Sequence, residues 1–172
     1  MTIETTVRVL TTDDAAELFR LRREALLDSP FSFTASPEEE STTSSVENVR
    51  ATLKRSPHSP VFGAFAGPRL VGMLGLYREP RRKAAHKVNL WGTFVTPEWR
   101  GKGLAKALLE AAVAYARTLE GVTDVQLGVT ESAADARRVY ERFGFKVWGT
   151  EPNAIRVQGR TECEYHMRLT LT

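Results

Sequence analysis

FVTPEWRGKGLA, residues 94–105, is the stretch of sequence that decides the fold. An apolar run typical of a strand stops at Pro97, and Gly101 and Gly103 lead directly into a helix-forming segment rich in Ala and Leu. The first N–H groups of a helix have no partner within it, and the aligned peptide dipoles add a partial positive charge there. The segment therefore predicts a site for a phosphate-bearing cofactor.

The composition is that of an ordinary globular protein. The chain has 172 residues, which fits one domain over 1–172 with a substantial core. Its net charge of +3 is too small to indicate nucleic-acid binding. Cys163 is the only cysteine, so an internal disulfide is excluded and a reducing compartment is expected. Because no apolar run approaches about twenty residues and no signal pattern opens the chain, we expect a cytoplasmic protein without membrane contact.

Hydrophobic periodicity and turn residues outline the elements on both sides of the glycine turn. We expect a first strand near 7–10, a helix that ends at Ser29-Pro30, a loop over 31–45 and a helix over about 45–55. A hairpin at 61–66 and 70–77, a basic loop at 78–87 and a strand at 88–95 follow. Beyond the helix after the glycines, we expect a strand at 122–129, a helix at 132–142 and strands at 146–148 and 161–170. This order predicts an α/β fold, with a mixed sheet of about six to seven strands flanked by about four helices.

Two common phosphate loops do not fit the glycine turn. A Walker A loop needs Lys-Ser/Thr after its last glycine, where this chain has Leu104-Ala105, and a dinucleotide fingerprint needs a third glycine, where it has Lys106. What remains is Arg100-x-x-Gly103-x-Ala105, which resembles the acyl-CoA pyrophosphate loop of the GNAT superfamily of N-acetyltransferases. The resemblance implies acetyl-CoA as co-substrate, bound by Phe94, Val95, Arg100, Gly101, Lys102, Gly103, Leu104 and Ala105.

A second segment points to the same superfamily. Ala136-x-x-Val139-Tyr140-x-x-x-Gly144-Phe145 resembles the later GNAT motif, whose helix packs beside the pantetheine arm. One position differs, because Ala133 stands where the family commonly has Asn. The adjacent Ser132 could replace part of the missing hydrogen bonding.

The resemblance implies direct transfer of an acetyl group from acetyl-CoA to an amine, on a small molecule or a protein. A backbone N–H near the end of the 88–95 strand, that of Val95, would polarise the thioester carbonyl. Tyr140 would act as general acid toward the departing thiolate. An alkyl ammonium is almost wholly protonated at pH 7, so a base or water relay must also take its proton.

The sequence does not single out that base. The candidates are Glu24, Glu79, His86 and Glu164, while the acidic run 38–40 could attract a cationic amine. Trp91 is a candidate for the acceptor pocket or the core, and Cys163 is expected to be packing. The histidines, His58, His86 and His166, lack metal-ligand spacing, so no metal is predicted.

Two further interpretations remain beside the enzyme. A non-catalytic acyl-CoA-binding or sensor module would keep the glycine loop without a productive acceptor site. A nucleic-acid-binding protein would rest only on the pI near 9.2 and the basic cluster 81–83, and we do not favour it. The resemblance leaves a homodimer open.

Overall fold

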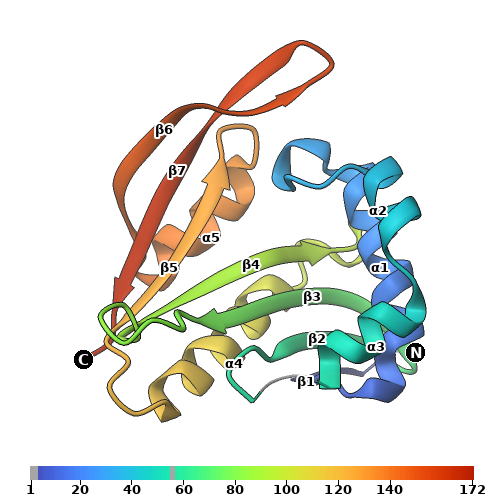
Figure 1. The fold of residues 1–172 in the computed structure, drawn as a ribbon, viewed down its shortest axis with the longest axis horizontal. Coiled ribbons are helices and arrows are strands. Elements are labelled where there is room, and N and C mark those ends of the chain that lie inside the picture. Colours follow the sequence, from blue (N-terminus) through green and yellow to red (C-terminus); the bar gives the residue numbers. More distant parts are fainter. Residues whose placement is uncertain (1–3, 55–56) are drawn as a thin grey trace.

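The computed structural model describes residues 4–54 and 57–172 and contains one mixed sheet (Figure 1). The strand order is β1-β2-β3-β4-β5-β7-β6, and every neighbouring pair is antiparallel except β4 and β5. The strands are β1 (Thr5–Val9), β2 (Val61–Ala66), β3 (Arg69–Arg78), β4 (Lys87–Val95), β5 (Asp124–Thr130), β6 (Lys146–Val157) and β7 (Arg160–Thr170).

Helices cover both faces of this sheet (Figure 1). On one face Leu21 of α1 packs in a buried cluster with Leu70 and Met73 of β3. On the other, Leu108 of α4 packs with Leu74 of β3. The α-helices are α1 (Ala15–Asp28), α2 (Pro37–Thr43), α3 (Val46–Lys54), α4 (Leu104–Thr118) and α5 (Ala134–Phe143), and the 3-10 turns are η1 (Thr12–Asp14), η2 (Pro30–Ser32) and η3 (Pro97–Trp99).

The two parallel strands pair over only part of their length. Residues 87–89 of β4 pair with residues 124–126 of β5, and the strands then separate, as Figure 1 shows. Gly92 has a φ of +65° just beyond the paired part, and the β3–β4 register shifts between Met73 and Gly75. The bulge turns β4 away while β5 follows β7, and a gap opens inside the sheet.

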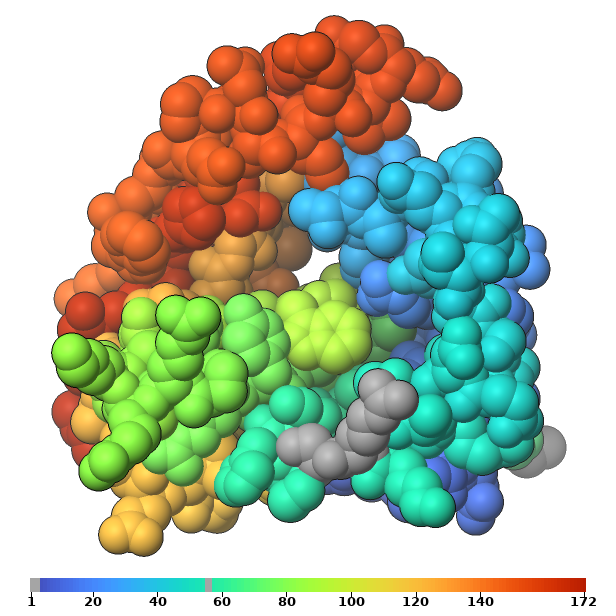
Figure 2. Space-filling view, viewed as in Figure 1, coloured from blue at the N-terminus to red at the C-terminus, as the bar shows by residue number. Residues whose placement is uncertain are grey.

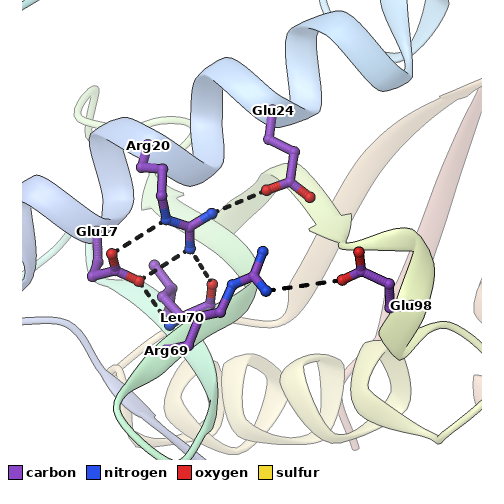
Figure 3. A network of polar contacts seen from close by, with 6 residues as sticks. All are labelled: Glu17, Arg20, Glu24, Arg69, Leu70 and Glu98. Atoms are coloured by element: carbon purple, nitrogen blue, oxygen red, sulfur yellow. Dashed lines mark hydrogen bonds and ion pairs between the residues drawn. The ribbon is translucent and has the colours of Figure 1, made fainter.

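A polar network fixes α1 against the start of β3 (Figure 3). Arg20 donates to Glu17, to Glu24 at 3.0 Å and to the Leu70 carbonyl at 2.6 Å. Glu17 in turn accepts the Leu70 N–H at 3.0 Å. The hydrogen bond from Arg20 is the main reason that the pKa of Glu17 lies below its usual range. The network therefore holds the helix that leads into η2 in one position on the sheet.

The predicted α/β fold is confirmed, including seven strands, but two predicted segments were wrong. The expected loop over 31–45 contains η2 and α2, so the described residues form five α-helices rather than about four. Ser36 and Glu39 form a reciprocal capping box with Pro37 in the first turn, and these residues start α2. The strand expected at 146–148 runs to Val157. Residue 55, the expected end of the second helix, lies outside the described residues, and none of the described helices is long and apolar enough to cross a membrane.

Candidate active site

The glycine turn adopts a conformation that needs glycine. Gly101 has a φ of +72° and Gly103 a φ of +81°, a region that side chains with a Cβ rarely adopt. Nothing lies within 4 Å of a Cβ placed at either position, so the backbone angle rather than crowding requires these glycines. Gly103 caps α4, and its carbonyl accepts the Ala107 N–H at 3.0 Å. The amides of residues 104–106 precede this first helical bond and are therefore available to an anion.

These amides border a large cavity, with a volume of about 780 Å³. η2 and α5 supply other parts of its wall, together with Ser132 and Ala133 just before α5. Seven of the eight residues predicted to bind cofactor line it: Phe94, Val95, Arg100, Gly101, Gly103, Leu104 and Ala105.

The two basic side chains of the turn are engaged by the protein itself. Lys102 is not part of the cavity wall, and its ammonium lies 4.2 Å from the centre of the Trp99 ring. Arg100 lines the cavity, yet it donates to the Val95 carbonyl at 3.0 Å and forms an ion pair with Asp28. Burial alone would raise the pKa of Asp28, but hydrogen bonds from Arg100 and Ser29 hold it below its usual range. Arg100 therefore ties α1 to the end of β4.

Val95 lies where β4 has lost one neighbour. The Thr96 N–H donates to Val71 of β3 at 2.9 Å. Successive N–H groups of a strand point to opposite sides, so the Val95 N–H points away from β3 toward the gap. The Val95 carbonyl is on the same side, where it accepts Arg100.

A second, inner chamber of about 70 Å³ adjoins the large cavity. Both are lined by Ser32, Thr93, Ala133 and Ala136. Figure 2 shows an opening on this side, between the orange β6–β7 segment and the blue-to-cyan segment with η2 and α2, with yellow-green β4 below it. The chamber wall also includes Tyr140 from α5 and Trp91 from β4.

Tyr140 is held as a neutral phenol in the wall of the inner chamber. It is buried, with 6% of its surface exposed. Burial raises its pKa above the usual value, and a hydrogen bond with the Thr93 side chain opposes only part of that effect. At neutral pH the hydroxyl therefore keeps its proton and can donate it.

Sequence comparison assigns the chain to a protein family. Residues 18–145, about three quarters of the chain, match the family described as "Acetyltransferase (GNAT) family". The chain belongs to the GNAT family of acetyltransferases. GNAT proteins use acetyl-CoA. The structure of yncA, a protein of Salmonella typhimurium described with its cofactor acetyl-CoA, is similar to this chain with a TM-score of 0.85 at 21% identity. The match covers 98% of this chain and 94% of that one. The GNAT acetyltransferase from Streptococcus pneumoniae has a TM-score of 0.89 at 20% identity, covering 98% of this chain and 100% of that one. At such identities the structures show a shared fold.

Curated relatives match shorter stretches. Mycothiol acetyltransferase of Salinispora arenicola is 44% identical over 59 residues, which are 34% of this chain and 19% of that protein. Spermine/spermidine N(1)-acetyltransferase of Bacillus subtilis is 30% identical over 87 residues, which are 51% of this chain and 56% of that protein. This GNAT chain therefore matches only part of the length of these relatives.

The structure separates the four candidate bases of the GNAT chain. Glu24 pairs with Arg20 in the network of Figure 3 and lines neither cavity. Glu79 accepts a hydrogen bond from Asn89 at 2.9 Å, and His86 provides backbone contacts to residues 123 and 124, where β5 begins. Of the four, Glu164 alone lines the inner chamber.

Side chains of the acidic run mainly serve the fold. Glu40 forms a 2.5 Å ion pair with Arg22, and Glu39 completes the capping box of α2. Trp91 lines the chamber and packs over Gly75. The expectation of Cys163 as buried packing was only partly right, because it is half-buried with its thiol 3.5 Å from Glu131.

A cluster of two carboxylates and one imidazole, which residue spacing in the sequence does not reveal, lies beside the chamber. Glu151 of β6 pairs in register with Glu164 of β7, and His166 follows on the same face of β7. One donor atom from each lies within 4.8 Å of the others. Exposed groups of this kind are common without a metal, so we do not assign them as ligands, and the absence of a metal stays a prediction. Thr93 and Thr130, which also line the chamber, gave no sequence signal because neither belongs to a motif.

Proposed function

We propose that this GNAT acetyltransferase moves an acetyl group from acetyl-CoA directly to the nitrogen of a primary amine, on a small molecule or a protein. The observation that carries the proposal is the junction of the two cavities. The larger is lined by the α4 amides and the free edge of β4, and the smaller contains the Tyr140 side chain and one carboxylate. The N(1)-acetylation of spermine and spermidine named for the partial relative supports an amine acceptor.

The chain's own groups fit the cofactor at its diphosphate. Main-chain amides at the N-terminus of α4 and the helix dipole favour an anion there. The positive φ of Gly101 and Gly103 keeps the turn open on its outer side, where even an added Cβ would have no atom within 4 Å. Bound at this turn, acetyl-CoA supplies a thioester whose carbonyl carbon accepts the amine.

Two groups then act on the thioester. The Val95 N–H would donate to the carbonyl oxygen as negative charge develops on it, and one such preorganised donor stabilises a transition state by about 3 kcal/mol. Tyr140 would protonate the sulfur as the C–S bond breaks. Its buried phenol, with a raised pKa, is suited to hold that proton until it is needed.

Acetyl-CoA turnover tests the function directly. Free thiol is measured after incubation with a panel of primary amines, polyamines and lysine peptides, with buffer alone as control. We expect thiol release that depends on at least one amine, with the acetylated product seen by mass spectrometry. Binding of CoA without amine-dependent release would instead favour the non-catalytic acyl-CoA-binding module.

A further inference from the structure

Two of the polar groups that line the inner chamber, Glu164 and Thr130, belong to none of the sequence motifs. The Glu164 carboxylate lies against Gly128, where a Cβ would collide with it, and Glu164 pairs in register with Thr130 of β5. Thr130 is buried, with 5% of its surface exposed, and its hydroxyl has no hydrogen-bond partner among the described residues. A buried hydroxyl without a partner costs free energy unless a ligand satisfies it.

We propose that Glu164 and Thr130 bind the acceptor's ammonium group and that the Glu164 carboxylate is the base that removes its proton. This inference rests on the proposed function and names its acceptor site. An ammonium group offers three donors, which matches one carboxylate and one hydroxyl with a donor left to exchange with water. Paired hydrogen bonds offset the cost of bringing the ammonium into the half-buried chamber.

The chamber has room for a primary aminomethyl group. Its volume of about 70 Å³ is several times the roughly 10–15 Å³ that a single buried water needs. Each substituent added to the nitrogen removes one N–H donor, and so one of the hydrogen bonds to Glu164, Thr130 or water. Trp91 and Leu127 add apolar surface to the wall, and Ser32, Thr93 and Tyr140 add polar groups. We therefore expect the acceptor to be a primary ammonium.

The charges around Glu164 suit proton removal. Burial raises the pKa of Glu164, nearby His166 lowers it, and Glu151 raises it. A carboxylate with a raised pKa is a stronger base toward an ammonium. The charged groups that act on it are His166 of β7 and Glu151 of β6, and Tyr140 of α5 lines the same chamber. Arg22 of α1 lies beside Gly92 and Trp91 of the chamber wall, where its ion pair with Glu40 compensates its charge.

A path leads the proton outward from the chamber. The Glu164 Oε1 atom lies 3.8 Å from His166 Nδ1, and His166 Nε2 lies 3.3 Å from Glu151 Oε2. Exposure increases along this path, from 31% for the Glu164 and His166 side chains to 57% for Glu151. The ionised carboxylate can thus be restored between turnovers.

The proton balance closes with these groups. The ammonium gives one proton to Glu164, and the nitrogen lone pair then forms the N–C bond to the thioester carbon. As the C–S bond breaks, Tyr140 gives its proton to sulfur, and the second nitrogen proton restores Tyr140. The products are the amide, free CoA thiol and one net proton, which leaves through His166.

The test compares Glu164→Gln and Glu164→Asp with a matched surface variant, Glu110→Gln, using n-butylamine and N-methylbutylamine. Glu110 lies on α4 outside both cavities and pairs only with Lys106 among the described residues. We expect Glu164→Gln to lower kcat/KM at pH 7 about 100-fold. This loss of kcat/KM should become smaller as pH rises, because a larger fraction of the amine is then already unprotonated. The kcat/KM of Glu164→Asp should lie between those of the wild type and Glu164→Gln, and that of Glu110→Gln should match the wild type. N-methylbutylamine should react poorly with every form.

Calorimetry with n-butylammonium chloride on the CoA-loaded protein tests the site without turnover. Glu164→Gln and Thr130→Val should weaken this binding at least about 5-fold while CoA affinity stays unchanged. A wild type that binds butylammonium through Glu164 but releases no CoA would contradict the proposed function alone. An active wild type whose Glu164→Gln variant keeps kcat/KM within about 3-fold would overturn the Glu164 assignment alone. Loss of wild-type turnover in EDTA would also overturn it, because the carboxylate would then hold a metal.

Discussion

The two adjoining cavities, which share Thr93 and Ala136 in their walls, are built in different ways. In the larger one, the proposed diphosphate site consists of main-chain amides and two positive-φ glycines within a continuous stretch, 94–105. The smaller one depends on side chains from η2, β4, β5, α5 and β7, which only the folded sheet brings together. A site made of backbone amides can bind the same kind of ligand in proteins that differ in their side chains. A site made of side chains can change the acceptor that it binds through single substitutions.

The largest expected effect concerns Tyr140 in the wall of the smaller cavity. Tyr140→Phe removes the proposed acid but keeps the buried ring, which packs near Phe145. We expect kcat to fall about 100- to 1,000-fold with CoA affinity unchanged, because general acid catalysis contributes factors of this size. Steady-state kinetics and CoA calorimetry measure the two quantities.

Tyr115→Phe is the matched control for this prediction. Tyr115 lies on α4, and its hydroxyl donates to the Pro57 carbonyl outside both cavities. Its loss should leave kcat unchanged. If Tyr140→Phe also kept the wild-type kcat with a good substrate, the acid role would be wrong.

The backbone character of the larger cavity predicts a second, smaller effect. Gly103→Ala forces a Cβ into a φ of +81°, which costs about 1–2 kcal/mol. Gly67→Ala imposes a similar cost at a φ of +57° in the β2–β3 turn, away from the cavities. We expect both variants to lose similar thermal stability, but only Gly103→Ala to bind CoA about 10-fold more weakly. Equal CoA affinity in the two variants would contradict the anion site at α4.

The contrast also explains what the sequence could predict. Gly101, Gly103 and Tyr140 lie in local motifs with fixed spacing, so the sequence alone predicts their positions. The function of Glu164 depends on Thr130 and Gly128, which are more than thirty residues away and become its neighbours only through β5–β7 pairing. A single strand carries no information about that register.

Two errors in the fold have equally local causes. Helix α2 was hidden by its polar composition, although Ser36-Pro37 followed by Glu39 is a capping signal that could have found it. The extension of β6 was hidden by Pro152 and by Asn153, which has a φ of +52° within the strand. The irregular register between Glu151 and Ile155 accommodates both residues.

The link between the larger cavity and α1 predicts a pH effect on stability. Asp28 pairs with Arg100, and its pKa in the folded protein lies below the ordinary value. A carboxyl group with a depressed folded pKa stabilises the fold above its unfolded pKa, near 3.9, and loses this contribution as pH falls through the folded pKa. We expect Asp28→Asn to lower the thermal midpoint by about 2 °C at pH 7 and by less as pH falls below about 4. A midpoint difference that stays constant down to pH 2 would show that the pair does not stabilise the fold.

The smallest expected effect concerns the basic residue that the sequence placed on the cofactor. Lys102 lies over the Trp99 ring and outside the cavity wall, while Arg100 lines that wall and holds the Val95 carbonyl. An exposed charge near a phosphate contributes only a few tenths of a kcal/mol in physiological salt. We therefore expect Lys102→Ala to weaken CoA binding about 2-fold at 0.15 M salt and Arg100→Ala to weaken it more, because Arg100→Ala also frees the end of β4. A 10-fold loss in Lys102→Ala that disappears at high salt would mean that Lys102 leaves Trp99 to contact the diphosphate, and the anion site would then depend on side chains as well as on amides.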